Sequence, residues 1–521
     1  MSSGYSQRLM AAVVVLTLIA SGCSPSATPP TEAPAAAVAD PTATEPAPIG
    51  IGGQREEVWM ACYINEGRIG YTHLIVEPVN EDGRACLRWT YEDQLTLRRF
   101  DAETVVRTRL TSLETREGEL LSFRSEMNTG PGTTTTEGRC KDGRLVVREA
   151  TQGKVQERTL EWDRQTGSYF ADHFSLRRKP MRPGESRRLQ ALMPVTNQVG
   201  EIQLQAETLE ATALAGDTQT LLRISVTTDL GPAQLKSVVW TDEQGRPLKV
   251  KDLQLGMEAF ATTREDALQQ ATGGSFDLGF DTIVRVDRPL PSPHRTRRIV
   301  YRAQLKEGDV KSLFATGTSQ TVRPLDDGTV EVTVQAVRPD QPPKAADQPQ
   351  DAPTDADRQP STLLQSDDAA VVQMAQAVAA GESDSWTVAC ALEQHVKKTI
   401  RLKNYTTAMA TAAEVAQSLQ GDCTEHAMLL AALSRARQIP ARVAIGLVYY
   451  PAARGFAYHM WTEVWIKDRW IPLDATLGLG GIGGAHLKFT HSSMQGTAAY
   501  AELFPVVQAL GRLELEIVSV E

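Results

Sequence analysis

The chain has 521 residues, too many for a single hydrophobic core, so its length predicts roughly two to four domains. Its hydrophobic content of 41% and charged content of 23% are typical of a soluble globular protein. The net charge of −10 argues against nucleic acid or an anionic lipid surface as the main partner.

The N-terminus carries the features of an export signal. Arg8 precedes the apolar run LMAAVVVLTLIA (9–20), which is too short to span a bilayer comfortably. A charged residue, an apolar run and small residues before Cys23 predict a secretory signal peptide over 1–22. The stretch IASGC also resembles the bacterial lipobox, in which the signal is cut before a cysteine that becomes lipidated. Ala20 stands where the lipobox usually has leucine, and an ordinary signal peptide with a chance cysteine is the alternative.

The segment that follows has the composition of a tether. Residues 23–54 are rich in Pro, Ala and Thr and lack core-forming residues, which predicts a disordered spacer after a lipidated Cys23. We therefore expect an exported lipoprotein anchored to a membrane of the bacterial cell envelope, facing the periplasm or at the surface. Export would permit one disulfide among Cys62, Cys86 and Cys140, and their spacing does not choose the pair.

From about residue 55 the pattern is mostly β. Runs such as ETVVRTRLTSL and TLLRISVTT alternate apolar with polar residues, and turn sequences such as KDG and DEQG separate them. This periodicity predicts antiparallel meanders with one wetted face, in a large all-β domain over 55–272. With phrases such as WTDEQGRPLKVKD, the region is loosely similar to the half-barrels of envelope lipoproteins and their carriers. A smaller β domain is expected over 273–340, and a linker rich in Pro, Asp and Gln over 341–361.

The pattern changes to helical spacing after residue 361. Apolar residues preceded by Ser or Asp predict helices in SDDAAVVQMAQAVAAG and SDSWTVACALEQHVKKTI, and TAAEVAQSLQ is a third candidate. A fourth helix is expected from Cys423 to about Gln438, where Pro440 ends it. ARVAIGLVYYP predicts a strand, and HMWTEVWI with RWIPLDAT predicts a hairpin. These elements give an α+β domain over 362–480, and an extension over 481–521 ends in a strand.

One cysteine lies at the start of the fourth helix, in GDCTEHAMLL. Asp422 suits the N-cap, which puts Cys423 at the first helical position, where the helix dipole favours a thiolate. Glu425 follows Asp422 by three residues, as in a capping box. The alternative is a small buried hydrophobe, because free cysteine is among the most buried residue types. This stretch alone does not decide between a nucleophile and a core residue.

The predicted hairpin supplies a base and a carboxylate. In a strand, His459 shares one face with Trp461, and a two-residue turn at 467–468 would pair Trp461 with Asp474. Asp474 would then lie diagonal to His459, roughly 7–8 Å away at Cα, within reach of its side chain. A one-residue change of register would put Asp474 on the wrong face. Taken singly, His459 could be structural and Asp474 could cap a turn.

Together, GDCTEHAMLLAALSRARQIPARVAIGLVYY and HMWTEVWIKDRWIPLDAT resemble the bacterial transglutaminase-like superfamily. The core of that superfamily shares its catalytic geometry with papain-type cysteine peptidases. The resemblance covers about residues 360–480 and includes three motifs in the family's order. It implies a papain-like α+β fold with Cys423 as nucleophile, His459 as general base and acid, and Asp474 as the orienting carboxylate. No stretch looks like a calcium loop or a cofactor site, so neither a metal nor a cofactor is expected.

The implied reaction is acyl transfer on an amide bond of a protein or peptide. The thiolate of Cys423 would form a thioester, which water or a primary amine would resolve, and the backbone N–H of Cys423 is a natural oxyanion donor. The alternative is a non-catalytic envelope lipoprotein that binds or scaffolds a partner and carries a vestigial transglutaminase-like domain. The intact triad counts against that alternative, which would however give the large β region a role.

Overall fold

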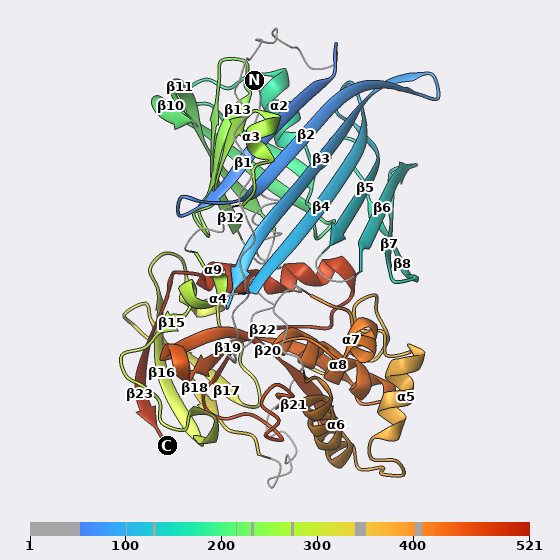
Figure 1. The fold of residues 1–521 in the computed structure, drawn as a ribbon, viewed down its shortest axis with the longest axis vertical. Coiled ribbons are helices and arrows are strands. Elements are labelled where there is room, and N and C mark those ends of the chain that lie inside the picture. Colours follow the sequence, from blue (N-terminus) through green and yellow to red (C-terminus); the bar gives the residue numbers. More distant parts are fainter. Residues whose placement is uncertain are drawn as a thin grey trace, which may run out of the picture.

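The computed structural model describes residues 53–100, 102–128, 132–214, 216–230, 234–271, 276–338, 351–401 and 409–521. The predicted signal peptide over 1–22 and the candidate lipidation site Cys23 lie outside these residues. The described chain has two parts, a large antiparallel sheet and a region of helices and smaller sheets below it (Figure 1). This arrangement confirms the predicted fold class, a large all-β region followed by an α+β region.

The described upper part is one antiparallel sheet of 14 strands. The chain begins in the middle of the sheet with β1 and proceeds strand by strand to one edge at β8. It then crosses to the opposite edge at β9 and returns to β14, which pairs with β1. The strands are β1 (Glu56–Ile64), β2 (Gly67–Glu81), β3 (Arg84–Arg99), β4 (Ala102–Thr115), β5 (Leu120–Asn128), β6 (Thr134–Lys141), β7 (Arg144–Thr151), β8 (Lys154–Glu161), β9 (Ser186–Leu192), β10 (Val199–Leu214), β11 (Asp217–Asp229), β12 (Gln234–Thr241), β13 (Pro247–Asp252) and β14 (Glu258–Thr262).

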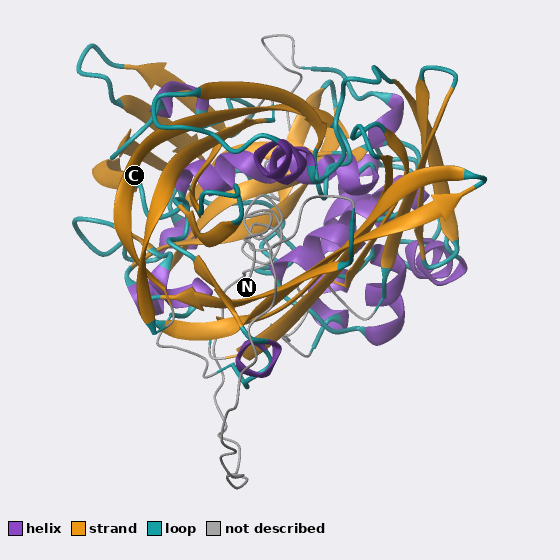
Figure 2. Ribbon diagram, turned by 90° about the horizontal axis from the view of Figure 1, so that it is seen from above, coloured by secondary structure: helices purple, strands orange, loops and turns teal. Residues whose placement is uncertain are grey.

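Side chains in this sheet alternate between a buried and a wetted face, as the period-2 sequence runs predict. In β4, Val106 and Leu110 are buried, whereas Val105 on the other face is exposed. Seen from above, the strands form a curved wall (Figure 2). The crossover segment contains the short helix α2 (Ala171–Arg178) and packs on the inner face, where the ring of Phe170 stacks on Trp89 at 5.4 Å.

The lower part contains two smaller antiparallel sheets. In the first, the order is β15 (Val284–Arg285), β20 (Gly455–Ile466), β19 (Ala441–Tyr450) and β22 (His486–Ser492), and β21 (Arg469–Leu473) also pairs with β20. In the second, the order is β17 (Gln320–Pro324), β18 (Val330–Gln335), β16 (Arg298–Leu305) and β23 (Leu513–Val520). The first of these sheets carries His459 on β20, and Asp474 directly follows β21.

Helices pack beside these sheets. The predicted helices are present as α5 (Ala369–Ala377), α6 (Ser385–Thr399), α7 (Ala412–Ser418) and α8 (Cys423–Ala436), and the shorter helices are α3 (Arg264–Ala267), α4 (Leu278–Asp281) and α9 (Phe504–Ala509). Aspartates cap α5 and α6, as expected, because the side chains of Asp368 and Asp384 accept hydrogen bonds from the first helical N–H groups. Helix α8 is buried along almost its whole length, between the other helices and β20.

Apolar side chains from both parts meet in one core. Leu95 and Leu97, near the end of β3, belong to the same buried cluster as Leu278 of α4 and Val284 of β15. Burial of this kind stabilises by about 1.5–3 kcal/mol for each large aliphatic side chain. The lower ends of the first strands are therefore buried against the helical region.

Within the predicted smaller β domain over 273–340, β16, β17 and β18 pair with one another, but two of the strands in this range also join distant parts of the chain. β15 pairs with β20, and β16 pairs with the C-terminal strand β23. The predicted extension over 481–521 likewise supplies β22 to one small sheet and β23 to the other. Alternation in the sequence identified these strands, but it carries no information on which distant strand each one joins.

The described end of the predicted linker, residues 351–361, packs against the helical region. Ser361 Oγ donates a hydrogen bond to the carbonyl oxygen of Met494 at 2.6 Å, and Ser493 Oγ donates to Asp357 Oδ1 at 2.6 Å. Both Asp357 and Ser361 are buried. Apart from one turn of 3-10 helix at Asp355–Asp357, this stretch is a loop, as its composition predicts, and polar contacts hold it in place.

Two further expectations concern the cysteines and the membrane. Cys86 and Cys140 carry free thiols, so no disulfide joins any two of Cys62, Cys86 and Cys140. Within the described residues, no helix combines the length and the apolar character needed to cross a bilayer.

Candidate active site

Cys423 is the first residue of α8 and is buried. The side chain of Asp422 accepts a hydrogen bond from the N–H of Thr424 at 2.9 Å, and Glu425 Oε2 accepts from the N–H of Asp422 at 2.9 Å. These two bonds complete the capping box that the sequence predicts. The cap fixes the helix start at Cys423, where the partial positive charge of the N-terminus favours a thiolate.

Helix α8 runs along β20 in the direction of that strand. Near its end, the Arg435 guanidinium donates to the carbonyl oxygen of Ala441, the residue of β19 that pairs with Val464. Two turns earlier, Thr462 Oγ1 donates to the carbonyl oxygen of Ala427 at 3.0 Å. Moving back along the helix therefore means moving back along β20, so the end that bears Cys423 lies toward the part of β20 that bears His459.

The hairpin of β20 and β21 has the predicted register. Ile466 pairs with Arg469 across a two-residue turn, and Lys467 and Asp468 both have positive φ, 50° and 60°. Such φ values are those of the tight turn whose twist matches antiparallel strands. The last pair is Thr462 with Leu473, which places Asp474 level with Trp461, as expected.

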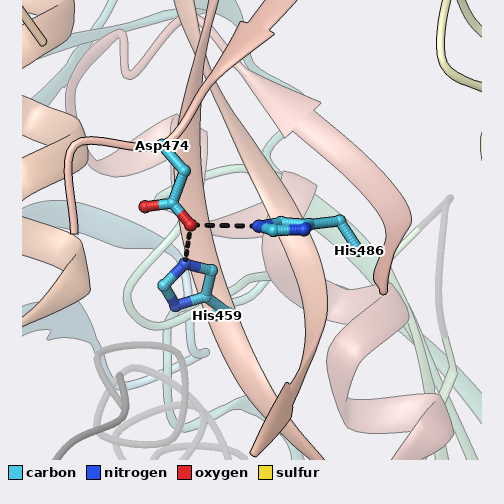
Figure 3. Close-up of side chains that lie close together, drawn as sticks. All are labelled: His459, Asp474 and His486. Atoms are coloured by element: carbon cyan, nitrogen blue, oxygen red, sulfur yellow. Dashed lines mark hydrogen bonds and ion pairs between the residues drawn. The ribbon is translucent and has the colours of Figure 1, made fainter. Parts of the chain in front are cut away.

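His459 and Asp474 meet on one face of this hairpin. Nε2 of His459 lies 2.8 Å from Oδ2 of Asp474, and both side chains are buried (Figure 3). An ionised carboxylate can only accept, so Nε2 carries the hydrogen and Nδ1 of a neutral ring keeps its lone pair. Among the described residues, Nδ1 of His459 has no hydrogen-bond partner. This nitrogen is thus the atom available to take a proton.

A second histidine, His486 of β22, binds the same carboxylate oxygen. Its Nε2 lies 3.0 Å from Oδ2 of Asp474, to the right of this oxygen in Figure 3, whereas His459 lies below it. Oδ1 of Asp474 accepts the N–H of Thr476 at 2.8 Å. The ring of Trp461 stands beside both imidazoles, with centroids 6.1 Å from His459 and 5.4 Å from His486. The carboxylate is therefore held from three directions.

Sequence analysis did not identify His486. The stretch HLKFTHS has the alternation of a strand, which could have placed His486 on one. Its contact with Asp474 depends on the pairing of β22 with β19, in which His486 lies opposite Val448. That pairing joins residues far apart in the chain, and no local pattern encodes it.

The charges of the site follow from burial and from these contacts. Burial disfavours the charge on Asp474, but the attraction of His459 and the hydrogen bonds of both histidines hold its pKa well below its ordinary value. Burial lowers the pKa of His486, although Asp474 opposes this. Burial, together with repulsion from Asp474, raises the pKa of Glu393 on α6 to about 8. Asp474 is thus the ionised carboxylate and Glu393 the protonated one at neutral pH.

The donor atoms of His459, Asp474 and His486 lie within 4.8 Å of one another, a spacing at which they could hold a metal ion. Here the same atoms bond directly, at 2.8 and 3.0 Å. A metal ion would have to replace both hydrogen bonds. The arrangement as it stands satisfies the carboxylate without one.

One edge of β20 is left without a strand partner beside His459. β15 pairs with Gly455 and Phe456, and β21 pairs from Thr462 onward. Between them, no described strand pairs with this edge over residues 457–461. Thr462 Oγ1 contacts the carbonyl oxygen of Ala427 on α8, so His459, three residues away on the alternating strand, points to the other face of the sheet.

A buried ion cluster holds the strands behind the site. Nζ of Lys488 on β22 lies 2.6 Å from both carboxylate oxygens of Glu463 on β20, and Nε of Arg442 on β19 lies 2.8 Å from Oε2 of Glu463. Burial opposes the charge on Glu463, but the two cations lower its pKa to about 2. The cluster ties three adjacent strands together two positions beyond Trp461.

Comparisons with known proteins agree with this geometry. The family described as the transglutaminase-like superfamily matches residues 372–475, which include α6, α7, α8 and the hairpin. No curated protein shows significant similarity to the chain.

Several solved structures share weak overall likeness. A protein from Cytophaga hutchinsonii described as a candidate cysteine protease is 16% identical, with 44% of this chain and 89% of that chain covered and a TM-score of 0.29. A β-barrel-like protein of unknown function from Brucella abortus is 10% identical, with 40% and 95% covered and a TM-score of 0.30. A candidate protease from Parabacteroides distasonis is 10% identical, with 78% and 67% covered and a TM-score of 0.19. At such TM-scores these likenesses support no conclusion about this chain. The family match does: residues 372–475 form a domain of the transglutaminase-like superfamily.

Proposed function

We propose that this protein is a cysteine-dependent acyl-transfer enzyme of the cell envelope, acting on amide bonds of a protein or peptide through a thioester. The observation that carries the proposal is the buried 2.8 Å hydrogen bond between His459 and Asp474. It leaves Nδ1 of His459 able to accept a proton, and α8, which begins at Cys423, packs against the same strand.

In the proposed reaction, the thiol of Cys423 meets Nδ1 of His459 at the unpaired edge of β20 and transfers its proton there. The thiolate attacks the carbonyl carbon of the amide, and the backbone N–H of Cys423 donates to the oxyanion that forms. His459 then protonates the leaving nitrogen, which departs as ammonia or an amine and leaves a thioester. Water or a primary amine attacks the thioester, gives its proton to His459 and restores the thiol.

Asp474, His486 and the protonated Glu393 support this proton transfer. Asp474 fixes the tautomer of His459 and stabilises the imidazolium. His486 and the N–H of Thr476 hold Asp474, so the carboxylate cannot turn away from His459. The protonated side chain of Glu393 adds no negative charge beside Asp474 at neutral pH.

An assay with a fluorescent primary amine and casein tests the proposal. Incorporation of the amine by the wild type, absent in Cys423→Ala, would indicate transfer. Release of ammonia or cleavage of casein without incorporation, again dependent on Cys423, would indicate hydrolysis. If the wild type and Cys423→Ala behave alike in all three readouts, the enzymatic proposal is wrong and the non-catalytic binding role takes its place.

We also propose that Cys23 is lipidated and anchors the chain to a membrane of the envelope, on the strength of the signal and spacer in the sequence. Fractionation of cells that produce Cys23→Ala should find the protein in the soluble envelope fraction, whereas the wild type sediments with membranes. Equal membrane retention of both proteins would contradict lipidation.

A further inference from the structure

The hairpin of β3 and β4 reaches from the large sheet to the start of the nucleophile helix. In Figure 1 these two strands extend below their neighbours toward the helical region. β3 ends at Arg99, whose Nη2 lies 2.7 Å from Oδ2 of Asp422, the residue before Cys423. The side chains of Arg99 and Asp422 are 0% and 1% exposed. A fully buried ion pair thus joins two residues 323 positions apart.

Phe100, at the tip of this hairpin, packs closely against residues of the lower part of the molecule. The ring of Phe100 packs edge-on against Phe280 at 5.1 Å and against Tyr450 at 5.9 Å. The N–H of Phe100 donates to Asp277 Oδ1 at 2.9 Å. A Cβ at Gly279 would lie 2.7 Å from the Phe100 ring, so the approach there requires glycine. The contacting residues belong to α4, to its N-cap and to the end of β19. Because they fix Phe100, they also fix the position of the neighbouring Arg99.

Arg99 counters the negative charge at the helix start. Asp422 and Glu425 are two buried carboxyl groups in the first turn of α8, and the Arg99 guanidinium bonds the first of them. Burial and repulsion from Glu425 raise the pKa of Asp422 well above its ordinary value, and the attraction of Arg99 opposes this rise. Without Arg99, the side chain of Asp422 would lose the buried partner that holds it in place. Breaking the pair would also loosen the cap, because one oxygen of Asp422 binds Arg99 and the other binds the N–H of Thr424.

We propose that Arg99 is a positioning residue of the active site, through which the β3–β4 hairpin holds the first turn of α8 and keeps Cys423 reactive. The inference rests on the proposed function in one respect, the role of Cys423 as the nucleophile. It gives the large β region a part in the reaction, because the β3–β4 hairpin holds the helix turn that bears the thiol of Cys423.

The test is the rate at which iodoacetamide alkylates Cys423 in the full chain at pH 7, resolved from the other cysteines by peptide mass spectrometry. Arg99→Met should slow alkylation about tenfold, and Arg99→Lys, which keeps the charge, should stay within about threefold of the wild type. Asp422→Asn keeps a good cap and leaves no buried carboxyl group that needs Arg99 as its partner. The double variant Arg99→Met with Asp422→Asn should therefore react about threefold or more faster than Arg99→Met alone.

Arg177→Met is the matched control. Arg177 of α2 forms a similarly buried ion pair at 3.2 Å, with Glu56 of β1 in the large sheet and not with a residue of α8. It should lower the melting temperature and leave the alkylation rate of Cys423 unchanged. The proposal is overturned if folded Arg99→Met reacts at the wild-type rate, if Asp422→Asn brings no recovery, or if Arg177→Met slows Cys423 equally.

The alkylation test of Arg99 and the activity test of the proposed function can fail independently of each other. If the wild type lacks acyl-transfer activity while Arg99→Met still slows alkylation, the proposed function fails and the positioning role stands. If activity is present and Arg99→Met neither slows alkylation nor reduces turnover, the positioning role fails and the proposed function stands.

Discussion

The large sheet and the small catalytic sheet are built in opposite ways. In the described large sheet, every pairing except that of β1 with β14 joins strands that follow one another in the chain. In the small sheet, β20 is flanked by β19 and β15, and β22 joins from beyond the hairpin. The first is assembled from local hairpins, and the second collects strands from residues 284 to 492.

The two sheets also differ in what they bury. Strands of the large sheet alternate between a buried and a wetted face, whereas β19 and most of β20 are buried on both faces. Charged groups in the small sheet are therefore desolvated and paired, as in the cluster of Glu463, Lys488 and Arg442. The comparison teaches that the strands of the small sheet, collected from distant parts of the chain, bring several charged groups into one buried network, and that the large sheet reaches the nucleophile helix at one hairpin tip.

The largest effect is expected at Asp474. Asp474→Asn replaces an acceptor by a group that can donate, which favours the wrong tautomer of His459 and removes the charge that stabilises imidazolium. Turnover of the folded variant in the acyl-transfer assay should fall about 10³-fold or more. A loss of less than about tenfold in the folded variant would break the assignment of this carboxylate.

Removing one cation from the buried ion cluster should strongly destabilise the small sheet. Lys488→Met leaves Glu463 with Arg442 as its partner in the cluster, and we expect a loss of about 3–5 kcal/mol in the free energy of unfolding of the helical region. Urea denaturation followed by tryptophan fluorescence measures it, because Trp461 and Trp470 lie in this sheet. An unchanged midpoint would mean that the cluster contributes nothing net.

The raised pKa of Glu393 should make the free energy of unfolding depend on pH. Its folded pKa of about 8 exceeds the ordinary value of 4.5, so the folded state holds an extra proton between these pH values. Stability should therefore fall as pH rises from about 5 through 8, by on the order of 3 kcal/mol. Glu393→Gln, which mimics the protonated group, should remove this fall. If thermal melts at pH 6 and pH 9 show the same fall in the variant, another group is responsible.

The smallest effect is expected on the wetted face of the large sheet. Arg124 pairs with Glu126 and Glu137, and the three side chains are 49%, 36% and 45% exposed. Arg124→Ala should change the free energy of unfolding by less than about 1 kcal/mol. A loss as large as that of Lys488→Met, measured in the same urea titration, would contradict the contrast between the two sheets.

Much of the site could be predicted because its parts are locally encoded. The cap at Asp422 and the turn at Lys467–Asp468 are short-range signals, and they correctly set the helix start and the hairpin register. That register was enough to bring Asp474 to His459.

The parts that could not be predicted depend on distant pairing. His486 reaches Asp474 through β22, and Arg99 reaches Asp422 from a hairpin in another part of the fold. In the sequence Arg99 is one more charged residue at a turn between alternating strands. The same limit explains why the strands over 273–340 were predicted as a separate domain, although β15 and β16 pair with strands near the C-terminus.

The central claim is that His459 activates Cys423, and the alkylation rate of Cys423 in the wild type and in His459→Ala tests it most directly. Cys390 serves as an internal control, because burial raises the pKa of its thiol to about 12 and it lies outside the site. We predict that, between pH 6 and 7, Cys423 of the wild type reacts about tenfold or more faster than Cys423 of His459→Ala, while Cys390 reacts equally slowly in both. Equal rates at Cys423 in the two folded proteins would contradict the account.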